Sequence, residues 1–234
     1  GGNPGDEEFI TEFGKYGDSD GEFIWPAGIA LDDQQRVYIS DEFLNLILVF
    51  DSEGNHIQSW NGLKPDGSTL QGPCGIAINN SQQIFVVEST GDKVSKFTLT
   101  GDFIQEWGSH GSGEGELNRP WGAAIDPEGN VYVADHKNNR VQKFTDSGKY
   151  LLSFGTFGDG RGELNRPSDV CVDNEGDVYV CDWANSRVQI YSPEGRFITS
   201  LTGDARELSK WCQMMTDANP AVIQRRREIK DPET

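Results

Sequence analysis

Short apolar runs alternate with polar positions along most of the chain, and turns rich in Gly, Asp and Asn separate them. In one segment the runs 122–126 (GAAID), 131–135 (VYVAD), 140–144 (RVQKF) and 149–154 (KYLLSF) follow one another, and PEGN and TDSG turns join the first and last pairs. Alternation with β-branched residues is typical of strands, and such turns are typical of hairpins. The segment therefore predicts four short strands.

The same order of strands and turns recurs every 47 residues. The positions that keep this step are the prolines Pro26, Pro73, Pro120 and Pro167, the turn glycines Gly54, Gly101, Gly148 and Gly195, the acids Asp41, Glu88, Asp135 and Asp182, and the aromatic residues Phe13, Trp60, Trp107 and Phe154, with Leu201 in the next place. A repeat of this length with four strands predicts a β-propeller blade. One blade cannot bury both of its faces, so the copies are expected to pack around an axis.

The fold class predicted is therefore all-β, a β-propeller of four-stranded antiparallel blades. Its region is 8–203, and the complete blades are expected near 23–60, 70–107, 117–154 and 164–201, after a strand of an incomplete blade at 8–14. Residues 1–7 are expected to form a disordered tail. The repeat stops after Gly203, and the spacing of Asp204 and Glu207 is a helix-capping pattern, so 204–234 is predicted to be a helical insertion or extension.

Two copies carry a specific resemblance: RPWGAAIDPEGNVYVADHKNNRVQKFTDSGKYLLSFG and RPSDVCVDNEGDVYVCDWANSRVQIYSPEGRFITSL. They resemble the NHL repeat, and the likeness extends over about Phe9–Gly203. Other copies depart from it, with Glu88 in place of Asp and with Leu46 and Lys93 at the place of Arg140. The resemblance implies a six-bladed propeller of the TolB-like type. The chain is then expected to be an N-terminal fragment whose partners include the remaining blades, with a closed four-bladed ring as the alternative.

The charge and the cysteines limit the kinds of partner and site that the sequence allows. The formal net charge is -18, which opposes binding to a phosphate backbone and predicts no nucleic-acid partner. No apolar run approaches the length of a membrane span. The cysteines lack metal-site spacing; Cys171 and Cys181 are expected on adjacent strands, either as a disulfide or, as we favour, as two buried thiols. The compartment is not determined, although the composition is compatible with export.

Residues that break the repeat are the best candidates for a binding site, because a repeated residue usually serves the fold. The Asp135–Arg140 and Asp182–Arg187 pairs recur and are predicted to be structural. Non-repeated aromatic, apolar, Arg and His residues cluster at the predicted loops of one face, a composition typical of interfaces. These candidates are Trp25, Phe43, Leu44, Arg119, Trp121, His136, Arg166 and Trp183. The alternative is that the Trp residues pack between blades.

The sequence favours a non-catalytic scaffold that binds a protein, peptide or glycan ligand, and it predicts no cofactor. The NHL resemblance also implies an alternative, a metal-dependent lyase or hydrolase of the peptidyl hydroxyglycine lyase type. The candidate zinc ligands are His110 and His136, fewer than a catalytic zinc needs. A DSDGE stretch at 18–22 resembles the start of a calcium loop but lacks its distal ligands.

Overall fold

The computed structural model describes residues 12–202. Of the strand predicted at 8–14 only residues 12–14 are described, and the tail at 1–7 and the helical segment at 204–234 lie outside the described residues. No helix within 12–202 is long and apolar enough to span a bilayer. The predictions for the two termini therefore remain predictions.

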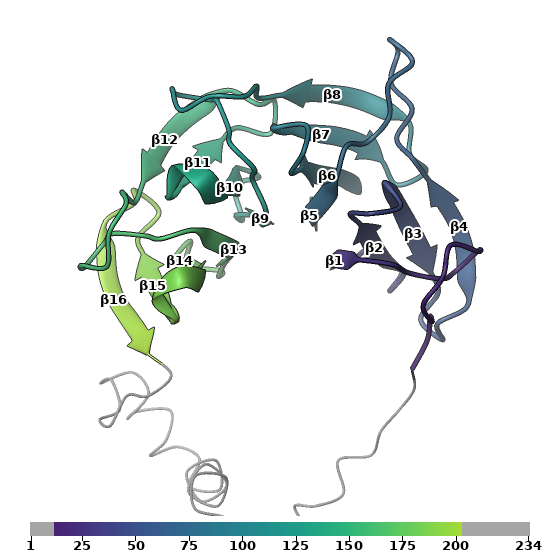
Figure 1. Cartoon of the computed structure of the whole chain (residues 1–234), viewed down its shortest axis with the longest axis horizontal. Helices are drawn as coiled ribbons and strands as arrows, with labels where there is room; N and C mark the ends of the chain where they lie inside the picture. The colour runs from purple at the N-terminus through teal and green to yellow at the C-terminus, as the bar shows by residue number, and fades with distance from the viewer. Residues whose placement is uncertain (1–11, 203–234) are drawn as a thin grey trace, which may run out of the picture.

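Sixteen strands form four antiparallel sheets of four strands each, and each sheet follows chain order from its inner to its outer strand. The blades are β1 (Pro26–Leu31), β2 (Val37–Asp41), β3 (Leu46–Phe50) and β4 (His56–Trp60); β5 (Pro73–Ile78), β6 (Gln83–Glu88), β7 (Lys93–Thr98) and β8 (Phe103–Trp107); β9 (Ala123–Ile125), β10 (Val131–Asp135), β11 (Arg140–Phe144) and β12 (Tyr150–Phe154); and β13 (Pro167–Val172), β14 (Val178–Asp182), β15 (Arg187–Tyr191) and β16 (Phe197–Thr202). The blades lie side by side on an open arc, with β1, β5, β9 and β13 at its inner edge (Figure 1). The predicted fold class, an all-β propeller of four-stranded antiparallel blades, is confirmed.

An aromatic residue at the end of β4, β8 and β12 packs onto the next blade, and this contact explains part of the 47-residue step. Trp107 lies against Phe144 of the next blade, with ring centroids 6.0 Å apart. The turn that follows β11 passes so close that a Cβ on Gly148, whose φ is +80°, would lie 2.6 Å from the Trp107 ring. Such a position requires glycine. The equivalent pairs are Phe13 with Gly54, Trp60 with Gly101 and Phe154 with Gly195.

The inner strands of neighbouring blades also meet closely. The Gly75 N–H donates to the Trp121 carbonyl at 2.6 Å, and a Cβ on Gly75 would lie 2.4 Å from the same oxygen. A side chain there would separate the two blades. The place of Gly75 is held by Gly28 in the first blade, by Gly122 in the third and by Asp169 in the last.

One acidic side chain in each blade is fully buried, and the four blades satisfy it in three ways. Asp135 accepts hydrogen bonds from the Asn118 N–H at 2.8 Å and from Arg140 Nε at 2.8 Å. Arg140 also donates to the Gly113 and Glu116 carbonyls, at 2.7 Å and 2.9 Å. The predicted structural role of this pair is confirmed, and Asp182 with Arg187 repeats it at 2.7 Å. The pair holds the long loop that precedes its own blade, a contact that the sequence did not indicate.

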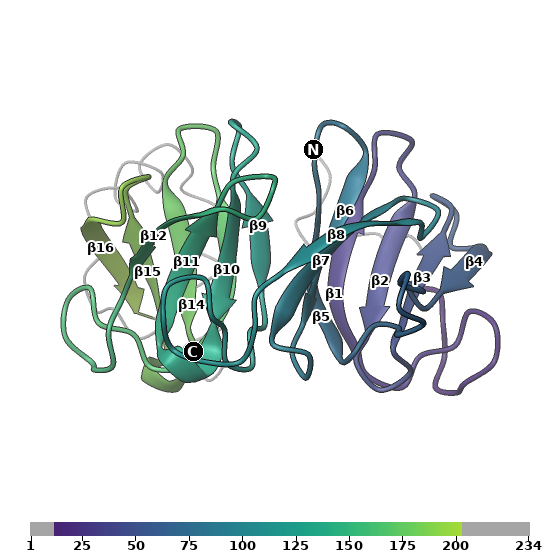
Figure 2. The ribbon, with the colours of Figure 1, turned by 90° about the horizontal axis from the view of Figure 1, so that it is seen from above.

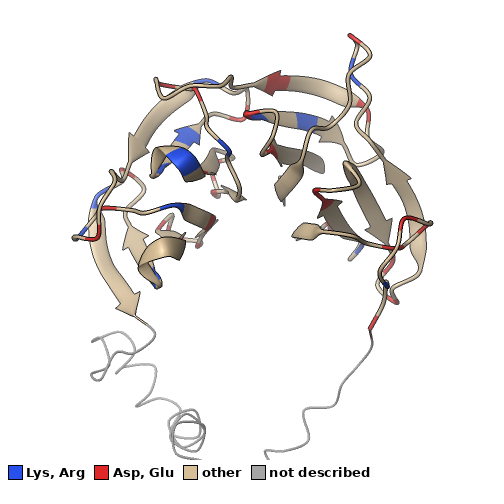
Figure 3. Cartoon of the chain, in the orientation of Figure 1, with Lys and Arg blue, Asp and Glu red and all other residues tan. Residues whose placement is uncertain are grey.

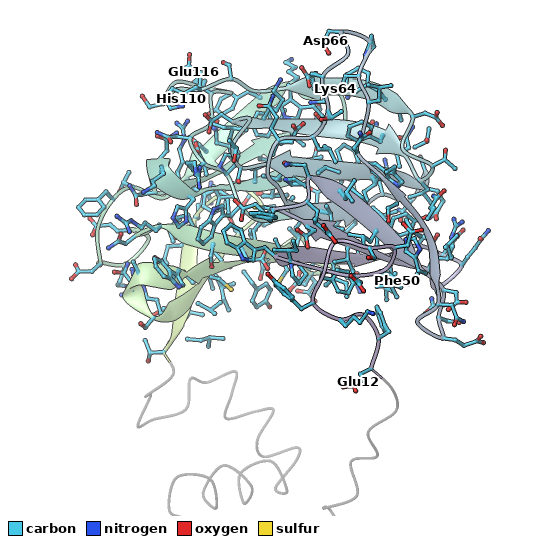
Figure 4. The ribbon with its side chains drawn as sticks, turned by 45° about the vertical axis from the view of Figure 1, so that its right-hand side comes forward. Glu12, Phe50, Lys64, Asp66, His110 and Glu116 are labelled. Atoms are coloured by element: carbon cyan, nitrogen blue, oxygen red, sulfur yellow. The ribbon has the colours of Figure 1, made fainter. Side chains whose placement is uncertain are left out.

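The second blade replaces this arrangement. Its acid is Glu88, and Lys64 from the preceding loop reaches it, with Nζ 2.7 Å from Glu88 Oε1 and 2.8 Å from Glu106 Oε2. Lys93, at the arginine place, bonds Glu106 instead, at 3.0 Å. Figure 4 shows Lys64 and Asp66 on this loop at the outer rim, and His110 and Glu116 on the next loop.

The prediction that Cys171 and Cys181 are buried is wrong. Both are exposed and free, whereas Cys74 is buried. The two thiols lie on the face of β13 and β14 that, in the other three blades, packs on the next blade. Their equivalents in the third blade are Ala124 and Ala134, which are partly or fully buried. Exposure therefore follows from the place of this sheet at the end of the described arc.

Candidate ligand-binding surface

The long loops that enter each blade and the short connections between its second and third strands lie at one face of the arc. Two of those connections contain single 3-10 turns, η1 (His136–Asn138) and η2 (Trp183–Asn185). Figure 2 views the blades from the side and shows that the strands run between this face and the opposite one, where the tight turns lie. The predicted site residues all belong to this loop-rich face.

In the third and fourth blades, three aromatic rings form a cluster. The Trp121 and His136 rings are stacked, with centroids 3.9 Å apart and planes inclined by 22°. Trp183 lies 6.3 Å from Trp121 and 6.2 Å from His136. Trp121 is half-buried, His136 is 4% exposed and Trp183 is 56% exposed. The cluster is therefore anchored in the fold at one end and open to solvent at the other.

The His136 ring is fixed in place by a hydrogen bond. Its Nδ1 donates to the Pro167 carbonyl at 3.2 Å, which fixes the ring against the inner strand of the next blade. Burial lowers the pKa of His136 below its usual 6.5, and the charges of Lys137, Arg166 and Arg119 lower it further, against the opposing effect of the Pro167 bond. Lys137 directly follows this residue, and the charges of Arg119 and Arg166 are near enough to lower its pKa.

Arg119 and Arg166 have left-handed backbones, with φ of 49° and 53°. Their place in the second blade is taken by Gly72, with φ of 62°. In each case the N–H donates to the preceding blade, from Arg119 to Asp92 Oδ1 at 2.6 Å and from Arg166 to Asn139 Oδ1 at 2.9 Å. The backbones are thus fixed while both side chains are exposed to solvent.

We call the cluster and its cations the aromatic–cationic surface. It comprises Trp121, His136, Trp183, Arg119, Lys137 and Arg166. Figure 3 shows the basic positions on η1 and on the segments that enter β9 and β13. The sequence named five of these residues and missed Lys137, which directly follows His136 in the DHKNNR connection. Its proximity to a named candidate was the only available signal.

Trp25, Phe43 and Leu44 form a separate group on the first blade. The Trp25 and Phe43 rings are 5.3 Å apart at 71°, and they are 59% and 55% exposed. The buried Asp41 carboxylate holds both of their loops, because it accepts the N–H groups of Trp25 at 2.9 Å, Phe43 at 3.1 Å and Leu44 at 2.9 Å. The alternative in which the Trp residues are buried between blades does not describe Trp25 or Trp183.

The two histidines named as metal ligands have separate partners. His110 is exposed, and its Nδ1 lies 2.8 Å from Asp92 Oδ2, whereas His136 stacks on Trp121. Within residues 12–202 no group of three or more His, Cys, Asp or Glu side chains could hold a metal ion. In the DSDGE stretch, Glu22 accepts the Ser19 N–H at 3.1 Å and pairs with Lys15 at 2.7 Å.

A cavity of about 530 Å³ lies at the opposite face, where the inner turns of the last three blades converge. Its polar lining includes Asn79, Asp126, Asp146 and Asp173. Asp146 is paired with Lys96 at 2.6 Å and Asp126 with Lys143 at 3.0 Å. Sequence reasoning did not indicate this cavity, because its lining residues belong to the repeated turns.

The fold and the repeat define a class: the chain is an NHL-repeat β-propeller. The NHL repeat model matches residues 117–144 and 164–191. Among curated proteins, Protein lin-41 of Caenorhabditis elegans is 44% identical over 48 residues, which is 20% of this chain and 4% of that protein.

Solved structures share the architecture. Virginiamycin B lyase from Staphylococcus aureus is 19% identical, with a TM-score of 0.59 over 78% of this chain and 57% of that one. A gluconolactonase, XC5397 from Xanthomonas campestris, is 18% identical, with a TM-score of 0.59 over 74% of this chain and 60% of that one. The chain spans less than two thirds of the length of either enzyme. At these identities the likeness concerns the fold alone.

Proposed function

We propose that this propeller is a non-catalytic scaffold that binds a protein or peptide ligand on its loop-rich face, through the aromatic–cationic surface. The observation that carries the proposal is the solvent-open Trp183 ring beside the anchored Trp121–His136 stack. Trp and Arg are the residues that most often dominate the binding energy of protein interfaces. In this chain Trp121, Trp183, Arg119 and Arg166 lie on the loop-rich face, where the other contacts described recur from blade to blade.

The rigidity of the surface supports this function. Hydrogen bonds to buried groups hold the loops that carry the candidate side chains. The Asn118 N–H donates to the Asp135 carboxylate at 2.8 Å, and His136 Nδ1 donates to the Pro167 carbonyl at 3.2 Å. A ligand that docks on preformed loops loses less free energy to ordering than one that must order them. The exposed Trp25–Phe43 pair of the first blade offers a second apolar contact on the same face.

Panning of a random dodecapeptide phage library on the immobilised full chain tests this function. We expect the wild-type chain to enrich peptides that the Trp121→Ala/Trp183→Ala variant does not enrich. The matched control is Tyr16→Ala/Phe157→Ala. These two rings are 82% and 72% exposed, and they lie on the long loops that enter the first and fourth blades. Equal enrichment by the wild type and the Trp121/Trp183 variant, or loss of enrichment with the control variant, would contradict the proposal.

A further inference from the structure

We infer that the ligand of the aromatic–cationic surface is an acidic peptide segment, one that presents carboxylates to Arg119, Lys137 and Arg166 and an aromatic or apolar side chain to the rings. This inference rests on the proposed function and specifies the chemistry of its ligand. Three observations carry it: the cations lack acidic partners, two of them occupy strained backbone positions, and the aromatic cluster is near them.

The first observation is that the three cations lack acidic partners in an acidic molecule. The chain has 38 acidic residues and 20 Lys or Arg, so a basic side chain is surrounded by candidate partners. Arg140 and Arg187, for example, each pair with a fully buried Asp. Within residues 12–202, Arg119, Lys137 and Arg166 form no ion pair with an acidic side chain. Three unpaired cations in one place create a local positive potential that a small anionic ligand would complement.

The backbone at the two arginines costs free energy. A non-glycine residue in the left-handed region is disfavoured by its Cβ, and the second blade uses Gly72 at this position. Strained positions are retained most often where the side chain serves a function. The backbone N–H bonds at these positions do not need the guanidinium groups, so the fold does not explain why the residues are arginine.

The chemistry of the groups selects the ligand. A guanidinium binds a carboxylate through two parallel hydrogen bonds, and Lys adds a point charge. The half-exposed Trp183 ring and the Trp121 edge bind apolar or aromatic side chains. A peptide that alternates acidic and aromatic residues supplies both kinds of group within a few residues of extended chain.

A nucleic acid also carries negative charge and planar rings, but the size of the basic area argues against it. Single-stranded nucleic acid has one phosphate per nucleotide, and its binding depends on many neutralised phosphates. Only three unpaired cations gather here, in a chain whose net charge is -18. Phosphates beyond this area would meet a predominantly acidic molecule, whereas a short peptide needs only two or three carboxylates.

Fluorescence anisotropy with four labelled probes tests the inference on the full chain. Three dodecapeptides share the same Trp and Phe positions, and their remaining residues are all Glu, all Gln or all Lys; the fourth probe is an oligouridylate of equal length. We expect the Glu peptide to bind at least about 10-fold more tightly than the Gln peptide, and its affinity to fall about 5- to 10-fold when salt rises from about 50 to about 200 mM.

Charge-reversed variants locate the effect. Arg119→Glu/Arg166→Glu is expected to weaken binding of the Glu peptide at least about 10-fold. The matched control is Lys149→Glu/Arg196→Glu, which changes the net charge equally at two exposed turn residues of the opposite face and is expected to keep binding within about 2-fold. Equal melting temperatures of the two variants show that folding is not the cause.

The outcomes separate this inference from the proposed function. Preferential binding of the Gln or Lys peptide overturns the acidic ligand and leaves peptide binding intact. Tighter binding of the oligouridylate, or equal losses in the two charge-reversed variants, also overturns the inference. If no probe binds, the acidic ligand is overturned, and the library panning decides the proposed function independently.

Discussion

The strained arginines predict a trade between stability and binding. Replacing Arg119 and Arg166 with glycine removes the Cβ that disfavours their left-handed backbones, of φ 49° and 53°. That relief amounts to about 1–2 kcal/mol per residue. Glycine also makes the unfolded chain more flexible, which costs about 0.5–1 kcal/mol per residue. At the middle of these ranges the net gain is about 0.75 kcal/mol at each site, since the backbone N–H bonds to Asp92 and Asn139 do not depend on the side chain.

The double variant Arg119→Gly/Arg166→Gly is therefore expected to unfold at about 1–2 kcal/mol higher free energy than the wild type, a rise in melting temperature of about 2–8 °C. Urea denaturation followed by Trp fluorescence measures the free energy, and scanning calorimetry measures the temperature. The same variant is expected to lose binding of the Glu peptide, because both guanidinium groups are gone.

Arg196→Gly is the matched control, because Arg196 is exposed and does not have a positive φ. Glycine there lacks the compensating relief of strain, and the free energy of unfolding is expected to fall by about 0.5–1 kcal/mol. Opposite signs for the two kinds of site are the signature of backbone strain. A double variant that is no more stable than the wild type would refute the reasoning.

Three further perturbations test the packing around the site. Lys64→Met removes the ion-pair partner of the fully buried Glu88 carboxylate and should lower the free energy of unfolding by about 3–5 kcal/mol in urea titrations. Lys93 is partly exposed, so Lys93→Met should lower it by less than about 1 kcal/mol. Equal losses in the two variants would contradict the importance of the buried ion pair. Gly148→Ala places a methyl 2.6 Å from an indole of the preceding blade at φ +80° and should cost about 2–4 kcal/mol by the same assay, and a neutral effect would contradict the interblade contact. Because the pKa of His136 is lowered in the folded chain, the unfolded chain binds a proton first as pH falls, so stability should decrease below about pH 6.5 and level off below the folded-state pKa. Thermal melts between about pH 5 and pH 8 measure this dependence, and His136→Gln should remove the contribution of His136. An identical pH profile for the wild type and the variant would contradict this prediction.

The repeat made the blades predictable. Strands 131–135 and 140–144 were expected from alternation and turn chemistry, and β10 and β11 have the same bounds. The inner strand was expected at 122–126 and is Ala123–Ile125. Local signals are strong in such strands because the same residue types serve alternation, turn and interblade contact at once.

Burial at the ends of the arc was not predictable. Cys171 and Cys181 have small apolar side chains at places where the third blade has Ala124 and Ala134, so the pattern indicated a buried face. Whether such a face is covered depends on the neighbouring sheet and not on its own residues. A single sequence carries no signal for that neighbour, and the residue type alone gave the wrong result.

The site was predictable by residue type but not by pairing. The sequence named Trp121, Arg119 and Arg166 as candidates of one face, and the connections that carry them lie at the same ends of the strands. The sequence could not show that these arginines lack acidic partners while Arg140 has one. Whether a cation has an acidic partner depends on distances of a few ångströms between loops of different blades. Composition does not contain these distances.

The repeated acids connect the fold to the candidate site. Asp135 forms an ion pair with Arg140, and the pair holds the long loop that precedes the third blade. Asp41 has Leu46 at the arginine place, and its carboxylate instead accepts backbone N–H groups from the loops that carry Trp25 and Phe43. One buried carboxylate per blade thus fixes the loops through backbone atoms, whatever side chains the loops carry. The side chains of the loop-rich face can therefore differ from blade to blade, and in the third and fourth blades they include the residues of the aromatic–cationic surface.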